Sequence, residues 1–168
     1  MSNFIPNMYK KDIFSIDYNY LKNKGIKVLL FDLDNTLIEK GNYEINEKAI
    51  ELFNDLKKDF SIYIVSNSIN TKKIKKVSEA LGIEYIKDSR KPFKHGFKKL
   101  NLENVKENEI AMIGDQMVTD VWGGNRMNYF TILVDPINFD EWFGTKINRL
   151  IEKRTFTKNG RKRGGYYD

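Results

Sequence analysis

Carboxylate, hydroxyl and ammonium side chains gather in four short segments of the sequence. Asp32 and Asp34, separated by one residue, come directly after the apolar run Val28 to Phe31. Two carboxylates this close repel each other, and Mg²⁺, which prefers hard oxygen ligands, would relieve that repulsion. For such a pair alone, capping of the following turn is the favoured interpretation. Three further polar segments favour a metal site instead: Ser66 with Asn67, Lys91, and Asp115 with Asp120.

Apolar runs and helical periodicities alternate along the chain and predict the elements that carry these segments. Strands are expected at 26–31, 61–66, 83–86, 109–113 and 129–134, and helices at 46–59, 71–81, 93–100, after Gln116 and at about 140–153. This alternation predicts an α/β fold with a doubly wound, Rossmann-like, mostly parallel sheet. Because working residues of such sheets lie at the carboxyl ends of strands, the four polar segments should meet at one edge.

The length of 168 residues suits one domain. We expect an N-terminal arm with a short helix at 1–23, the catalytic domain at 24–153 and a basic, flexible tail at 154–168. The net charge of +6 equals the excess of eight Lys and Arg over two acids within 146–168. This basic end indicates either an anionic partner, such as RNA or acidic lipid, or a solvated terminus.

Several classes of protein and site are excluded by composition. The sequence has no cysteine and a single histidine, His95, so thiolate chemistry and His-rich metal sites are ruled out. Apolar runs are strand-sized, so no transmembrane helix is expected, and the N-terminus lacks a secretory signal. We therefore expect a cytoplasmic location. His95 has two open interpretations, a substrate contact or a surface position at the start of a helix.

The ordered segments DLDNT, VSNS, RKP and GDQMVTD resemble the four signature motifs of the haloacid dehalogenase (HAD) superfamily of phosphohydrolases. The N-terminal stretch FIPNMYKKDIFSIDYNYLKNKGIKVLLFDLDNTL further resembles the YqeG group, a capless class IIIA phosphatase family. The motifs span residues 32 to 120. Each is weak alone, whereas the four in order are specific.

The resemblance implies a role for each residue of the motifs. Mg²⁺ would be held by the carboxylates of Asp32 and Asp115 and the main-chain carbonyl of Asp34. The other roles carried over are the nucleophile (Asp32), the general acid and base (Asp34), its orienting residue (Thr36), the phosphate-binding hydroxyl (Ser66) beside Asn67, the cation bridging nucleophile and phosphate (Lys91), and support of the metal acid (Asp120).

These roles predict a Mg²⁺-dependent phosphatase that forms an aspartyl-phosphate on Asp32. The intervals between Asp34, Ser66 and Lys91 leave no room for a cap domain, so the site should be open to bulky substrates. The alternatives are a phosphatidylglycerophosphate phosphatase, implied by related capless enzymes, and a ribosome- or RNA-associated protein with secondary catalysis. A response-regulator receiver is disfavoured, because its phosphorylated Asp would occupy the position of Ser66.

Overall fold

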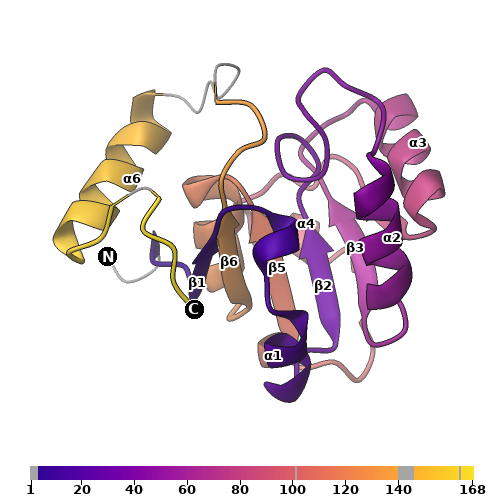
Figure 1. Ribbon diagram of the computed structural model, residues 1–168, viewed down its shortest axis with the longest axis horizontal. Coiled ribbons are helices and arrows are strands. Elements are labelled where there is room, and N and C mark those ends of the chain that lie inside the picture. The colour runs from indigo at the N-terminus through magenta and orange to yellow at the C-terminus, as the bar shows by residue number, and fades with distance from the viewer. Residues whose placement is uncertain (1–3, 101, 140–145, 163) are drawn as a thin grey trace.

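The computed structural model describes residues 4–100, 102–139, 146–162 and 164–168. Its centre is a six-stranded sheet of order β1-β6-β5-β2-β3-β4, in which every pairing is parallel. Figure 1 shows the sheet with α2 and α3 on one side and α6 on the other. The strands are β1 (Met8–Lys10), β2 (Val28–Phe31), β3 (Ser61–Val65), β4 (Glu84–Ile86), β5 (Ile110–Gly114) and β6 (Phe130–Val134). The predicted parallel α/β sheet is therefore confirmed.

The helices α2 (Glu47–Leu56) and α3 (Thr71–Leu81) connect the strands on one side of the sheet. The side chain of Asn46 accepts from the amide of Ala49 and caps α2. At the end of α3, Gly82 adopts the left-handed conformation, with φ of 62°, which glycine reaches without a steric penalty. Buried apolar residues along both helices face one continuous core that includes Phe31 and Phe53. The chain thus returns to the sheet after each strand.

The helices in the second half of the chain are shorter. After β4 comes α4 (Lys94–Phe97), and β5 is preceded by the 3-10 turn η3 (Glu107–Glu109). A π-helical turn, η4 (Met117–Trp122), and α5 (Gly123–Asn125) connect β5 to β6. The helix expected at 93–100 is thus reduced to four residues. Gly96 lies at its centre, where a Cβ would stand 1.5 Å from the carbonyl oxygen of Ser89.

The N-terminal arm contributes a strand that the sequence pattern did not predict. β1 pairs with β6, with Met8 opposite Ile132. A 3-10 turn, η2 (Ile13–Ser15), and α1 (Tyr18–Asn23) follow, and Asp17 caps α1. Met8 and Leu21 are fully buried, so this segment is part of the domain core and not a loose extension.

The C-terminal segment also differs from the expected flexible tail. α6 (Lys146–Lys158) continues into that segment, and residues 140–145 of the predicted helix lie outside the described residues. Beyond α6 the chain returns to the sheet, where Tyr167 forms an antiparallel bridge with Tyr9. Phe156 packs with Tyr9 in a small apolar cluster. Apolar packing on β1 thus holds a segment whose composition suggested solvation.

Candidate active site

The residues singled out in the sequence lie in the loops after β2, β3, β4 and β5, at the carboxyl edge of the sheet. β2 is central, with β5 on one side and β3 on the other. The chain runs from β2 outward to β4 and then crosses back to β5, so this is the point where the strand order reverses. Ligand sites of open α/β sheets form at such a point.

Lys91 joins two acids at the centre of the site. Its Nζ lies 2.7 Å from Asp32 Oδ1 and 2.7 Å from Asp120 Oδ1. All three side chains are almost fully buried. The second oxygen of Asp120 accepts from the amide of Gln116. One cation therefore fixes the carboxylates of the loop after β2 and of η4 relative to each other.

Asp115 completes a cluster of acids that one ammonium group does not neutralise. Candidate ligand oxygens of Asp32, Asp115 and Asp120 lie within 4.8 Å of one another. Asp115 Oδ1 accepts from Thr36 Oγ1 at 3.3 Å, whereas its Oδ2 is buried with no hydrogen-bond partner among the described residues. Three carboxylates and Lys91 leave two negative charges, which a divalent cation would balance. The donor set, all carboxylate oxygen, fits a hard cation such as Mg²⁺.

The protonation equilibria of the cluster reflect the same imbalance. Burial raises the pKa of Asp32 to about 7; Lys91 opposes this rise, and Asp120 and Asp34 add to it. Burial, followed by the charges of Asp32 and Asp120, raises the pKa of Asp115 well above its ordinary range. Burial alone would lower the pKa of Lys91, but the charges of Asp120 and Asp32 raise it. Without a further cation the site therefore retains protons on its acids.

Asn67 acts on the backbone around Lys91. Its Oδ1 accepts from the Lys91 amide at 2.7 Å and from Ser89 Oγ at 2.8 Å. Its Nδ2 donates to the Lys91 carbonyl at 2.9 Å. We expected Asn67 among the substrate-binding residues, but these contacts show its side chain holding the lysine segment. The neighbouring Ser66 is buried, and its Oγ accepts from the Ser68 amide.

Asp34 contacts a lysine that sequence analysis did not identify. Lys73, on the first turn of α3, donates to Asp34 Oδ1 and is 7% exposed. A signal existed, because Lys73 precedes the buried Val77 by one helical turn and therefore lies on the inward face of α3. Thr36 was expected to orient Asp34, but its hydrogen bond goes to Asp115. In the described structure, the ion-pair partner of Asp34 is thus a lysine on α3.

Gly114 is a second residue that the sequence analysis missed. A Cβ at this position, the last of β5, would lie 2.3 Å from Asp120 Oδ2. The carboxylate of Asp120 can therefore reach Lys91 only because the strand ends in glycine. The sequence contained a signal for this close approach, because Gly114 ends a continuous apolar run and directly precedes Asp115. A glycine at the end of a strand often marks a place where another group comes close to the backbone.

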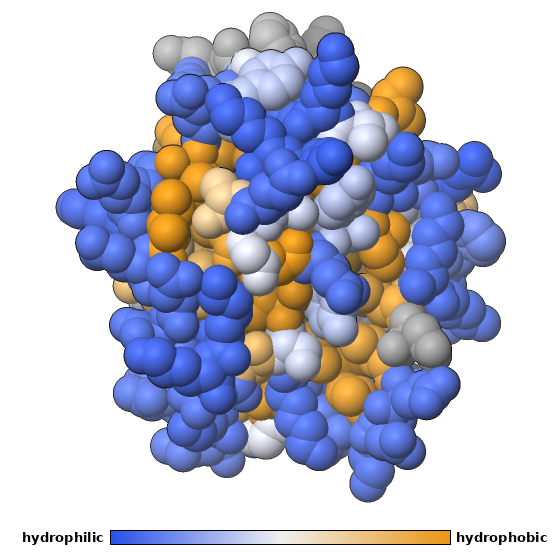
Figure 2. All heavy atoms as spheres, turned by 90° about the vertical axis from the view of Figure 1, so that its right-hand side faces the viewer, coloured by the Kyte–Doolittle hydropathy of each residue, from blue (hydrophilic) through white to orange (hydrophobic). Residues whose placement is uncertain are grey.

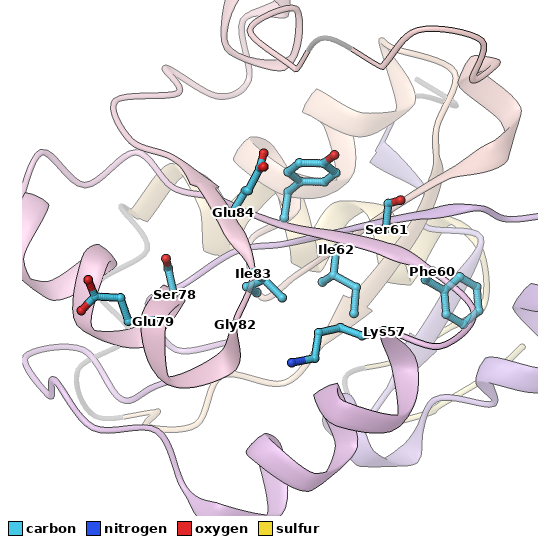
Figure 3. A pocket seen from close by; sticks show the side chains of 10 residues that line it. Lys57, Phe60, Ser61, Ile62, Ser78, Glu79, Gly82, Ile83 and Glu84 are labelled. Atoms are coloured by element: carbon cyan, nitrogen blue, oxygen red, sulfur yellow. The ribbon is translucent and has the colours of Figure 1, made fainter.

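A separate hollow lies at the opposite edge of the sheet. Figure 3 shows it, with Lys57, Gly82 and Glu84 among the residues around it. Its volume is about 590 Å³, and its walls come from the C-terminal ends of α2 and α3 and the beginnings of β3 and β4. Lys57 already donates to the Leu81 carbonyl. This hollow shares no residue with the acidic cluster.

Comparison with solved structures defines the class of the fold. A HAD hydrolase, YfnB from Bacillus subtilis, solved bound to magnesium, superposes with a TM-score of 0.54 over 66% of this chain and 89% of its own, at 14% identity. A HAD-like hydrolase from Porphyromonas gingivalis superposes with a TM-score of 0.52 over 76% and 98% of the two chains, at 13% identity. The fold is that of a HAD-like hydrolase.

Sequence relatives define the family. The pattern of the family described as "Mitochondrial PGP phosphatase" matches residues 1–138. The probable phosphatase YqeG of Bacillus subtilis is 40% identical over 95% of this chain and 93% of its own. Phosphatidylglycerophosphate phosphatase 1 of Arabidopsis thaliana is 28% identical over 80% of this chain and 41% of its own. The chain belongs to this phosphatase family, in its YqeG branch, and is a phosphoric monoester hydrolase of the HAD superfamily.

Two further expectations concern the position of His95 and the absence of a transmembrane helix. His95 lies exposed on α4, outside the acidic cluster. Among the described residues, no helix combines the length and the hydrophobicity needed to cross a membrane.

Proposed function

We propose that the chain hydrolyses a phosphomonoester in two displacements at Asp32, with Mg²⁺ as cofactor. The observation that carries the proposal is the buried contact of Lys91 with Asp32 and Asp120, next to an oxygen of Asp115 that has no hydrogen-bond partner. A carboxylate nucleophile divides a difficult hydrolysis into two easier steps. Lys91 lies where it can hold a phosphoryl oxygen and Asp32 together.

The metal would be held by the carboxylates of Asp32 and Asp115 and the main-chain carbonyl of Asp34. Asp120 fits a supporting role, because both of its oxygens already accept hydrogen bonds, from Lys91 and from the Gln116 amide. When bound, Mg²⁺ supplies positive charge that allows a phosphate dianion to approach the acids. The unpartnered Asp115 Oδ2 and the two uncompensated negative charges support this assignment.

In the first displacement, an oxygen of Asp32 bonds to phosphorus while the bond from phosphorus to the ester oxygen breaks. Asp34 gives a proton to that leaving oxygen. In the second, Asp34 takes a proton from water, the water oxygen bonds to phosphorus, and the bond between phosphorus and Asp32 breaks. Lys91 and the Ser66 hydroxyl bind the phosphoryl oxygens throughout. Lys73 positions Asp34 through its ion pair when Asp34 is ionised, as it is before it takes the proton from water.

We further propose that the substrate is a phosphorylated lipid headgroup, with phosphatidylglycerophosphate as the first candidate. Two relatives, from Arabidopsis thaliana and Chlamydomonas reinhardtii, carry that substrate in their names. The architecture supports a bulky substrate, because residues 32–60 contain a loop and α2 and no inserted domain. An anionic partner for the basic C-terminal segment remains a prediction.

The catalytic proposal is tested by hydrolysis of an aryl phosphate with and without Mg²⁺. Asp32→Asn should lose turnover, because an amide of similar volume does not attack phosphorus. Wild-type protein quenched in acid during turnover should carry one phosphoryl group on Asp32. Asp88→Asn is the matched control, since Asp88 lies at the same edge and, among the described residues, forms its side-chain ion pair with Arg90 and not with the acidic cluster. Turnover by Asp32→Asn at the wild-type level would exclude the aspartyl-phosphate.

The substrate proposal requires a separate comparison. Phosphatidylglycerophosphate in mixed micelles should give a higher kcat/KM than glycerol 3-phosphate and nucleoside monophosphates. A preference for a soluble ester would reject the lipid substrate and leave the catalytic proposal intact.

A further inference from the structure

Large apolar side chains are exposed mainly at the edge of the sheet that carries the acidic cluster. Nine such side chains are exposed among the described residues. Five of them lie in loops that follow the carboxyl ends of β2, β3, β4 and β6: Tyr43, Ile69, Phe93, Ile137 and Phe139. Single exposed apolar residues are normal on soluble proteins, but their concentration around one site indicates a surface that binds something.

Three of these side chains directly border the site, and we call them the apolar rim. Ile69, 80% exposed, follows Asn67 by two residues, and Phe93, 64% exposed, follows Lys91 by two. Ile137, 51% exposed, donates its amide to the Asn35 carbonyl at 2.9 Å. They follow β3, β4 and β6, and the strands from β6 to β4 span about 19 Å at the usual strand spacing. The rim thus lies in loops along the same edge of the sheet as the acidic cluster.

Two segments next to the rim residues Ile69 and Phe93 are rich in cations: residues 72–76 in the first turns of α3, and residues 87–99 in and around α4. Residues 87–99 hold one acid, Asp88, and residues 72–76 hold none. The cations of these two segments are Lys72, Lys73, Lys75, Lys76, Lys87, Arg90, Lys91, Lys94, Lys98 and Lys99. Lys72 and Lys94 are exposed and lie close in sequence to Ile69 and Phe93 respectively. Exposed apolar side chains beside exposed cations are the combination that binds anionic membrane surfaces.

The face that carries α2 and α3 has a mixed surface. In Figure 2 hydrophilic side chains dominate this face, and hydrophobic atoms appear as a band between them. The apolar rim lies instead in loops that follow the carboxyl ends of the strands.

We propose that the apolar rim and the cations beside it dock the protein on an anionic lipid bilayer, with the acidic cluster facing the headgroups. A bilayer fits better than RNA, because isoleucine side chains insert among acyl chains but do not stack on bases. The inference extends the proposed function, since a phosphate on a headgroup could then enter the site while its lipid stays in the membrane.

The test is co-sedimentation of the full chain with phosphatidylcholine vesicles that contain or lack phosphatidylglycerol. Wild type should bind the anionic vesicles and bind less as salt rises. Ile69→Ser combined with Phe93→Ser should weaken binding on the order of tenfold or more, since two inserted side chains are lost. Lys72→Glu combined with Lys94→Glu should weaken it roughly fivefold or more per residue and reduce the salt dependence.

Tyr20→Ser combined with Leu150→Ser is the matched control. These side chains are 42% and 54% exposed but belong to the helices α1 and α6 and not to the loops that carry the rim. The control should bind vesicles as wild type does. All variants should hydrolyse a soluble aryl phosphate at the wild-type rate, because none of these side chains contacts the acidic cluster in the described structure.

Vesicle binding does not require turnover, so docking and catalysis can fail independently. A wild type that binds vesicles but cleaves no phosphate ester would reject the proposed function and keep the docking surface. The docking inference is overturned if wild type ignores anionic vesicles at low salt or the control loses as much binding as the rim variant. It is also overturned if the rim variant instead dissociates a dimer of this chain, or loses binding to RNA while vesicles are not bound.

Discussion

Removal of metal should make the stability of the protein depend on pH through Asp32. The folded protein holds the pKa of this carboxyl at about 7, compared with an ordinary value of 3.8. Between these values the folded state binds more protons than the unfolded state, so stability falls as the pH rises. Ionisation of Asp32 lowers the free energy of unfolding little at pH 3.8. The loss grows by about 1.4 kcal/mol per pH unit and reaches about 4 kcal/mol at pH 7 and above.

Asp32→Asn removes this titration and isolates its contribution. In a chelator, the variant should gain stability relative to wild type by about 3 kcal/mol between about pH 5 and about pH 8, from the same arithmetic. Urea unfolding at several pH values measures the difference. Asp88→Asn should show no such trend, because Asp88 lies outside the acidic cluster.

Saturating Mg²⁺ should reverse the effect at the higher pH. The ion binds the ionised carboxylates of folded wild type and stabilises it by mass action, whereas Asp32→Asn has lost one ligand. A stability difference between the two proteins that stays constant with pH in chelator would refute the assignment of a buried, proton-retaining Asp32. A difference that Mg²⁺ leaves unchanged would refute its role as a metal ligand.

Three further predictions concern neighbouring residues. Lys91→Met should lower the free energy of unfolding by about 3–5 kcal/mol at neutral pH, since it removes the cation from two buried carboxylates. It should also weaken fluoroberyllate binding measured by calorimetry; unchanged affinity would mean that another residue binds the phosphate. Asp34→Asn should slow hydrolysis of alkyl phosphates more than of nitrophenyl phosphate, since only poor leaving groups need a proton, and an equal loss on both would contradict general acid catalysis. Gly114→Ala should cost about 1–3 kcal/mol in urea unfolding and lower turnover, because its Cβ displaces Asp120; wild-type behaviour would mean the strand shifts freely.

Local signals in the sequence were sufficient to predict the helices and strands that position the site. The predicted helix 71–81 matches α3 in both bounds, because Asn70 caps its start and Gly82 permits the left-handed turn at its end. Buried parallel strands are continuous apolar runs, and β2 and β5 are recognisable for that reason. Since carboxyl ends of parallel strands share an edge, the meeting of Asp32, Lys91 and Asp115 followed from the fold class.

Contacts between segments far apart in sequence could not be predicted in the same way. β1 has three residues, and its strand conformation depends on pairing with β6. The partner of Thr36 is Asp115, 79 residues away, and the partner of Asp34 is Lys73, 39 residues away. Each pairing depends on how the loops pack after the strands have assembled. Helical spacing indicates that Lys73 faces inward, but no local signal in one sequence identifies Asp34 as its partner.

The placement of β1 also constrains the order in which the protein can be completed during synthesis. Met8–Lys10 leaves the ribosome before the other five strands of the sheet, yet its partner strand is Phe130–Val134. A nascent chain that ends before residue 130 has no β6, and the buried side chain of Met8 then lacks its place in the sheet. This edge strand is thus made before the other strands of the sheet but can pair only after β6 is made, so completion of the six-stranded sheet must wait for most of these residues to be synthesised.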